Sequence, residues 1–272
     1  MTLCLAISLA EKRSFDLKDQ IQRYINWCHH GYMSSSKGYA FDVGLSTRVA
    51  LDLWAKEFER PGDGLTSGQE RINGSLNKDA RCGNGSLMRT APIALIYWQD
   101  SNEKIDDLTA KAGSVTHPHQ QCVEACQVYV RMICSILRSE DQLPSKKDLF
   151  GDLKDFTFET PKLKETFSAY RTLDDIKQAP DSTISSSGFV VHTLEAALWA
   201  FFSTESFRDG AIKAVNLGDD ADTVGAVYGG LAGAYYGLEE VPNDWIQELQ
   251  ARSTIDNVVT KVVELVSSQP AS

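Results

Sequence analysis

The stretch that decides the fold runs from Asn216 to Gly237 and reads NLGDDADTVGAVYGGLAGAYYG. Its first half is acidic and polar, whereas its second half is apolar and rich in small residues. Glycines at positions 225, 229, 233 and 237 fall four residues apart, so they share one face of a helix. Each glycine costs a helix interior about 0.8–1 kcal/mol relative to alanine. The pattern therefore predicts a buried central helix that packs unusually close to its neighbours, with oxygen ligands gathered at its N-terminus.

The rest of the chain fits an all-α protein. The sequence has 272 residues, of which 42% are hydrophobic and 24% are charged, as is ordinary for a globular domain. Apolar residues recur at helical spacing nearly throughout, and neither an internal repeat nor a change of composition marks a second domain. We therefore predict one all-α domain over residues 1–272, with a polar, aperiodic surface excursion at 139–160.

Charge and cysteine content exclude several classes of protein. The formal net charge of −10 argues against a nucleic-acid or anionic-membrane partner. None of the six cysteines forms a C-x-x-C motif, so a zinc ribbon is excluded, and Cys122 and Cys126 are expected to pack. The first ten residues lack the basic start of a signal peptide, and the apolar run 224–238 is shorter than the ~20 residues of a membrane span. These features predict an intracellular, cytoplasmic protein.

Asp220, Asp222 and Thr223 form the first candidate site. Two carboxylates and a hydroxyl at this spacing suit a hard divalent cation, Mg²⁺ or Mn²⁺, which prefers oxygen ligands. The same residue types also cap helices, because their side chains accept hydrogen bonds from the first backbone N–H groups. An EF-hand is excluded, since Leu231 stands where its bidentate Glu would be. The spacing leaves metal binding and capping open.

The segment Arg81–Arg89, RCGNGSLMR, is the second candidate. Two glycines with Asn84 and Ser86 at a helix start would present backbone N–H donors to a phosphate or a ribose, although an ordinary connecting turn would look the same. His117 lies in the sequence THPH, where the following proline favours an extended turn. The histidine could reach a ligand from there, or cap a helix at the surface.

Together these segments resemble the ADP-ribosylglycohydrolase family, which includes the dinitrogenase-reductase-activating glycohydrolases. The resemblance covers the chain from Met1 to about Val266. It is carried by MTLCLA, GNGSLMRTAP, THPH, SSSGFVVHTLEAALWAF and above all NLGDDADTVGAVYGGLAGAYYG. It implies an all-α orthogonal helical bundle around a two-metal site. The implied activity is hydrolysis of the glycosidic bond between ADP-ribose and a protein side chain or a related ADP-ribose conjugate.

The resemblance also implies roles for individual residues. The ligands of Mg²⁺, or of Mn²⁺, would be Asp220, Asp222 and Thr223. The residues implied to contact ADP-ribose are Asn84, Gly85, Ser86, Arg89 and His117. Among these, Arg89 would either bind the diphosphate or support the turn. Asp219 stands where the family usually has a glycine, and would lie behind the ligands. Bound metals would position the ribose and lower the pKa of a water.

One motif of the family is absent from the sequence. In the family, a Thr-Asp-Asp-Thr motif lies immediately before the segment that begins here with Met1, and it supplies the other half of the metal shell. The opening residues keep helical spacing without a capping residue, as if a segment preceded them. The resemblance therefore predicts weak metal binding and little hydrolysis. An ADP-ribose-binding pseudoenzyme and a structural, crystallin-like protein are the alternatives. Loops such as Ser34–Phe41 and Ser139–Thr160 would choose the linkage.

Overall fold

The computed structural model describes residues 1–36, 38–62, 64–139 and 142–268. Residue 37 of the predicted loop at 34–41, and residues 140–141 of the predicted excursion, lie outside the described residues. Within the described residues, helices are joined by loops and no β-strand forms, although Gly83 and Phe189 make an isolated antiparallel bridge. The all-α prediction is confirmed.

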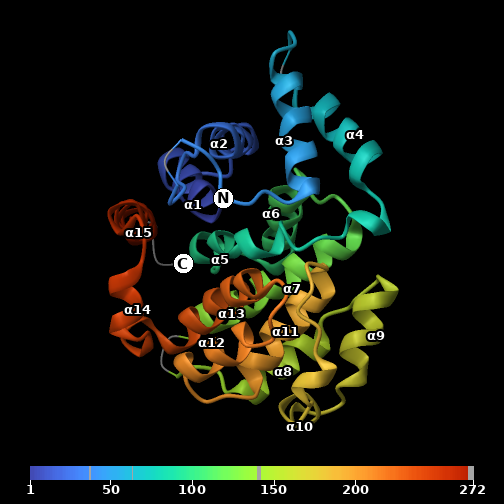
Figure 1. Ribbon diagram of the computed structural model, residues 1–272, viewed down its shortest axis with the longest axis vertical. Coiled ribbons are helices and arrows are strands. Elements are labelled where there is room, and N and C mark those ends of the chain that lie inside the picture. The colour runs from blue at the N-terminus through green and yellow to red at the C-terminus, as the bar shows by residue number, and fades with distance from the viewer. Residues whose placement is uncertain (37, 63, 140–141, 269–272) are drawn as a thin grey trace.

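The helices follow one another along the whole described chain. The α-helices are α1 (Thr2–Lys12), α2 (Leu17–His30), α3 (Leu45–Phe58), α4 (Leu65–Leu76), α5 (Ala91–Tyr97), α6 (Asn102–Ser114), α7 (Gln120–Leu137), α8 (Lys146–Asp155), α9 (Pro161–Ala169), α10 (Leu173–Lys177), α11 (Val190–Phe202), α12 (Phe207–Val215), α13 (Ala221–Tyr236), α14 (Asn243–Glu248) and α15 (Arg252–Ser267). The short 3-10 helices are η1 (Asp79–Arg81), η2 (Leu87–Arg89), η3 (Asp181–Thr183) and η4 (Leu238–Glu240). In Figure 1, α1 to α4 lie above and α8 to α10 lie below, with α7 and α11 between them.

The most enclosed helices are α7 and α11. Every side chain of α11 from Ala196 to Phe202 is at most 1% exposed. In α7, Cys122 and Cys126 are fully buried, as expected for cysteines that pack. A helix that is apolar all round is typical of the centre of a protein, and α13 packs against both of these helices. Within the described residues, no helix is both long enough and apolar enough to cross a membrane.

The glycine stripe of α13 does not make the predicted close contacts. The helix is buried along one face only, at residues 223, 224, 227, 228, 231 and 232. A Cβ added at Gly229 or Gly233 would meet no described atom within 4 Å. Gly225 is the exception, because its Cβ would lie 3.1 Å from Val215 Cγ1. The prediction was wrong because glycine spacing identifies a face of a helix, but not whether that face meets a neighbour.

A close approach of α13 to another helix occurs at Gly230, outside the stripe. A Cβ there would lie 2.2 Å from the hydroxyl oxygen of Tyr129 on α7. The Tyr129 hydroxyl donates a hydrogen bond to the carbonyl of Val227 at 3.1 Å. Only a glycine leaves room for this contact, so Gly230 sets the distance between α13 and α7.

The described part of the segment 139–160 is not the aperiodic excursion that the sequence suggested. It contains α8, whose first turn carries a capping box between Ser145 and Asp148. Leu149, Phe150 and Leu153 of α8 are buried, and the helix packs on α7. Polar residues on the outer face concealed a short amphipathic pattern, which the packing against α7 stabilises.

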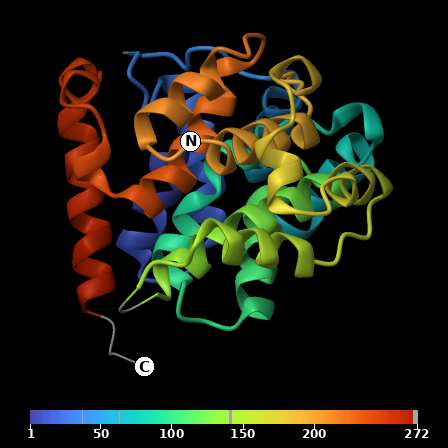
Figure 2. The same ribbon diagram turned by 90° about the horizontal axis from the view of Figure 1, so that it is seen from below.

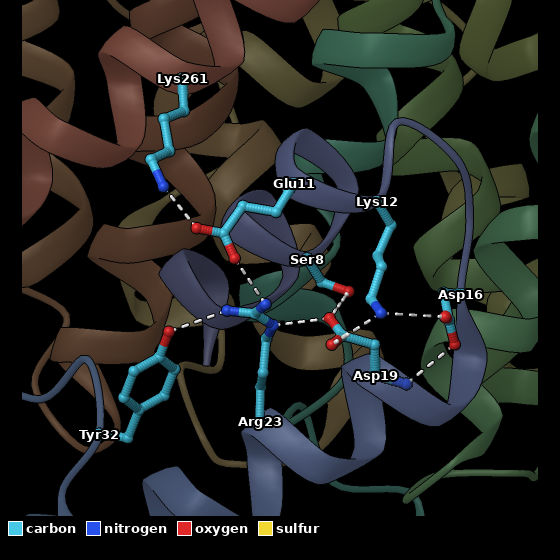
Figure 3. A network of polar contacts seen from close by, with 8 residues as sticks. All are labelled: Ser8, Glu11, Lys12, Asp16, Asp19, Arg23, Tyr32 and Lys261. Carbon is cyan, nitrogen blue, oxygen red and sulfur yellow. Dashed lines mark hydrogen bonds and ion pairs between the residues drawn. The ribbon is translucent and has the colours of Figure 1, made fainter.

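The helix α15 packs beside α1. Figure 2 shows α15 from the side, along one edge of the molecule. A polar network joins both helices to α2 (Figure 3). Arg23 of α2 donates to Asp19 at 2.6 Å, to Glu11 of α1 at 2.8 Å and to the Tyr32 hydroxyl at 2.8 Å. Lys261 of α15 pairs with Glu11 as well. Because Tyr32 begins the loop that leads to residue 41, this network holds the base of that loop.

Candidate active site

A cavity of about 580 Å³ opens among segments that are far apart in the sequence. Its wall draws on residues 41–47 before and within α3, on the turn at 80–89, on His117, on Gly188 and on residues 220–226 at the start of α13. Small-molecule sites commonly have volumes of about 300–1,000 Å³. The cavity is therefore large enough for a nucleotide-sized ligand.

Asp220 stands at the N-cap position of α13, but its side chain does not cap the helix. Its Oδ2 instead accepts a hydrogen bond from Asn84 Nδ2 at 2.6 Å. The same Nδ2 donates to Thr193 Oγ1 of α11 at 2.8 Å, and the Asp220 N–H donates to the Ser186 carbonyl at 3.1 Å. Capping therefore does not account for this carboxylate, which joins the glycine turn to α13 at the cavity wall.

Asp222 and Thr223 line the same cavity. The Asp222 Oδ1 accepts from the Thr223 N–H at 2.9 Å, and Thr223 Oγ1 donates to Met88 Sδ at 3.8 Å. Partial desolvation, together with the neighbouring Asp220 carboxylate, raises the pKa of Asp222. A cation near Asp222 would favour the ionised form of its carboxylate.

The chemistry of these donors fits Mg²⁺, which prefers carboxylate and hydroxyl oxygens. The fit is partial, however. Among residues 1–36, 38–62, 64–139 and 142–268, no group of three or more His, Cys, Asp or Glu side chains gathers as a metal site. Asp220, Asp222 and Thr223 offer two carboxylates and one hydroxyl at the cavity wall.

Arg89 lies beneath the glycine turn, and its side chain is 1% exposed. Its guanidinium donates to the carbonyl of Gly85 at 2.5 Å and to Thr116 Oγ1 at 2.7 Å. It also lies 5.0 Å from the centre of the Tyr24 ring, at the distance of a cation–π contact. Of the two roles expected for Arg89, these contacts favour support of the turn.

His117 is 3% exposed and lines the cavity, so the surface-cap alternative is wrong. Its Nδ1 lies 2.7 Å from Thr116 Oγ1. Thr116 Oγ1 also accepts from Arg89, and a hydroxyl hydrogen donated from Oγ1 to Nδ1 would place the proton of the neutral ring on Nε2. Burial, with the charge of Arg89, lowers the pKa of His117 to about 3. The histidine is thus a neutral donor at neutral pH.

The other predicted residues of the turn divide into two groups. Gly85 lines the cavity, and a Cβ there would lie 2.8 Å from His117 Cε1, so glycine is required. Ser86 does not line the cavity. It is fully buried, and its Oγ accepts a hydrogen bond from Cys126 Sγ at 3.4 Å. The turn thus directs the Ser86 side chain into the core, and a contact between Ser86 and the ligand stays a prediction that its side chain does not support.

Asp219 is exposed and lies outside the cavity wall, so it does not sit behind the ligands as expected. Its φ of 48° places it in the left-handed region. Glycine is at home there, and aspartate is one of the few other residues that tolerate it. The backbone, and not the metal, explains why this position suits a glycine.

Several residues of the cavity wall were not predicted from the sequence. An apolar part of the wall contains Trp27, Phe41, Leu45 and Met88, and Phe41 is 69% exposed at the mouth. Arg81 adds a positive charge just before the glycine turn. A phenylalanine within the turn sequence FDVG, directly before a helix, was a usable signal for an exposed aromatic residue.

The cavity has the ligand types of a metal-assisted site on an all-α fold, and comparison with known proteins places that fold. A family model described as ADP-ribosylglycohydrolase matches residues 1–271. This chain belongs to the ADP-ribosylglycohydrolase family. A solved structure described as an ADP-ribosylglycohydrolase-related protein complex is similar to it, with a TM-score of 0.73 and 33% sequence identity over 97% of this chain and 79% of that one.

Curated relatives in the ADP-ribosylglycohydrolase family have named activities. The chain is 31% identical over 258 residues to "ADP-ribosylarginine hydrolase Tri1" of Pseudomonas putida, covering 92% of this chain and 60% of that protein. A protein of the same name from Serratia proteamaculans is 29% identical, with 96% and 65% covered. The "ADP-ribosyl-[dinitrogen reductase] glycohydrolase" of Rhodospirillum rubrum is 27% identical, with 93% and 72% covered. The chain thus spans less than two thirds of the two Tri1 proteins.

Proposed function

We propose that this protein is a metal-dependent hydrolase that cleaves the glycosidic bond between ADP-ribose and a modified protein side chain or a related conjugate. The observation that carries the proposal is the placement of Asp220, Asp222 and Thr223 on a nucleotide-sized cavity, where Asn84 orients the first carboxylate. Two relatives are named ADP-ribosylarginine hydrolases, so arginine-linked ADP-ribose is the first substrate to test.

Asp220, Asp222 and Thr223 would hold Mg²⁺, which when bound polarises oxygen atoms and lowers the pKa of water. In the reaction, the oxygen of water bonds to the anomeric carbon of the ribose, the bond from that carbon to the side chain breaks, and the proton that water loses goes to the released side-chain atom. Asn84 would hold the Asp220 carboxylate in one orientation, because its Nδ2 is fixed by Thr193 as well. His117, as a neutral donor, would hydrogen-bond a ribose hydroxyl or a phosphate oxygen.

The test measures the release of ADP-ribose from a peptide that carries arginine-linked ADP-ribose, with Mg²⁺ or with a chelator. We expect D220N and D222N to lower the rate at least about 100-fold, since tenfold corresponds to about 1.4 kcal/mol. D219N is the matched control: it makes the same change of charge one residue away, off the cavity, and should stay within about twofold. Release that is unchanged in both cavity variants, or in chelator, would sink the proposal.

A binding measurement separates catalysis from recognition. Because the described residues offer two carboxylates and one hydroxyl, we expect calorimetry to show weak binding of Mg²⁺. Binding of ADP-ribose in the presence of Mg²⁺ without any release from the conjugate would contradict the hydrolase and favour a non-catalytic ADP-ribose binder.

A further inference from the structure

Arg81 is a half-buried arginine on the cavity wall, at the end of η1. No hydrogen bond or ion pair joins its guanidinium to any other residue that the structure describes. Arg89, the other arginine of the wall, differs because its terminal nitrogens are occupied by Gly85, Gly113 and Thr116. Among the described residues of the cavity wall, Arg81 is therefore the arginine whose guanidinium N–H groups are free to bind a ligand.

The negative charges around the cavity make a free cationic side chain important for binding an anion. Asp42, Asp220 and Asp222 line the same space, so an anionic ligand meets three carboxylates there. In a protein with a formal net charge of −10, the long-range field gives such a ligand no help. An anion needs a specific cationic partner within the cavity, and Arg81 is placed to be one.

We propose that Arg81 binds the diphosphate of the ADP-ribose group. The inference rests on the proposed function, since it names the residue that would recognise the anionic part of that substrate. A guanidinium presents paired N–H donors in a plane, which match two phosphate oxygens at once. Trp27 and Phe41 of the same wall offer aromatic surface that suits a purine base. The wall thus combines an aromatic surface for the purine base of the ligand with a cationic group for its diphosphate.

The experiment is calorimetric titration of the full chain with ADP-ribose, ADP and adenosine. R81A should weaken the binding of ADP-ribose and of ADP about 10- to 100-fold, because a charge-assisted hydrogen bond is lost. Its affinity for adenosine should stay within about twofold. R81K should lose an intermediate amount, since it keeps the charge but not the paired donors. R48A is the control, because Arg48 is exposed and lies off the cavity wall.

Salt provides a second measurement. The affinity of the wild-type chain for ADP-ribose should fall as KCl is raised, and that of R81A should fall less steeply. This comparison decides the matter where adenosine binds too weakly to be measured. Circular dichroism should show R81A folded as the wild type is, since no described contact of its guanidinium is lost.

The outcomes distinguish the two proposals. Equal affinity of R81A and the wild type for ADP-ribose, or an equal loss for adenosine, would overturn the role of Arg81 and leave the hydrolase intact. Binding of ADP that depends on Arg81, without release of ADP-ribose from any conjugate, would refute the hydrolase and keep the role of Arg81. A wild-type chain that binds neither ADP-ribose nor ADP would overturn both.

Discussion

The two sides of the cavity differ in how their polar groups are satisfied. The turn wall, residues 82–89 with 116–117, buries its polar side chains against one another, and the series runs from Arg89 through Thr116 to His117. The helix wall, residues 220–226, instead turns the carboxylate of Asp222 toward the open cavity. The polar side chains of the turn wall have partners inside the protein, as Asn84 has in Thr193 and Asp220, whereas Asp222 leaves carboxylate oxygen open to the cavity.

This difference separates the motif residues that can contact a ligand from those that cannot. A buried polar group costs stability unless it is hydrogen-bonded, so the partners of Arg89 and Ser86 lie inside the protein. The exposed carboxylate of Asp222 and the free guanidinium of Arg81 do not need a hydrogen-bond partner inside the protein. Membership of a sequence motif therefore does not by itself place a side chain on the ligand.

The largest expected effect on stability comes from removing the guanidinium that holds the turn wall together. Arg89→Met should lower the free energy of unfolding by about 3 kcal/mol or more, because the buried Gly85 carbonyl and Thr116 hydroxyl lose a charged donor. Urea denaturation measures it. Arg48→Met, an exposed position, should change the value by less than about 0.5 kcal/mol. A loss no greater than that of this control would show that Arg89 does not hold the wall together.

A smaller effect tests how the helix wall is placed. Gly230→Ala should lower the free energy of unfolding by about 1–3 kcal/mol, since the new Cβ would meet the buried Tyr129 hydroxyl. Gly229→Ala, one residue away in open space, should raise it by up to about 1 kcal/mol, because alanine is the better helix former. Both are read from chemical denaturation, and effects of the same sign would contradict the contact at Gly230.

A further effect concerns the pH dependence that the turn wall imposes. Folding lowers the pKa of His117 to about 3, against roughly 6.5 in an unfolded chain. Between these values the unfolded chain binds the extra proton, so this contribution is fully present above pH 6.5 and is lost as the pH falls, by up to about 1.4 kcal/mol per pH unit. His117→Gln should flatten the profile of unfolding free energy over that window.

The matched control for His117 is His30→Gln, which changes an exposed histidine and should leave the slope as it is in the wild type. Unfolding free energies measured from pH 4 to pH 7, in steps of about half a unit, compare the three chains. An identical slope for His117→Gln and the wild type would mean that His117 takes up its proton in the folded protein as readily as in the unfolded one.

Much of the fold was predictable because the apolar spacing of a helix is visible within a short stretch of sequence. Apolar residues stand at helical spacing over α6 (Asn102–Ser114) and α11 (Val190–Phe202). Apolar spacing along a few turns is enough to reveal such elements. α8 was missed, since its ten residues bury only one narrow apolar face, and that pattern is too short to stand out from a polar segment.

The candidate site was predictable in part. The motif gave Asp220, Asp222 and Thr223, together with Asn84, Gly85 and His117, and the structure brings these six residues to one cavity. The direction of the Ser86 side chain was not predictable, because it depends on the course of the turn against α7. Arg81 was not singled out either, since nothing in its local sequence tells that its guanidinium is free.

Periodicity and motifs are properties of neighbouring residues, so they were enough to indicate the helical class, the family and the acidic start of α13. Only the tertiary structure decided that Asn84 meets Asp220, 136 residues further along, and that Gly230 meets Tyr129 where the glycine stripe meets nothing so close. The physical reason is that a sequence records which face of a helix is apolar, whereas contacts between distant segments follow from how all the faces pack together.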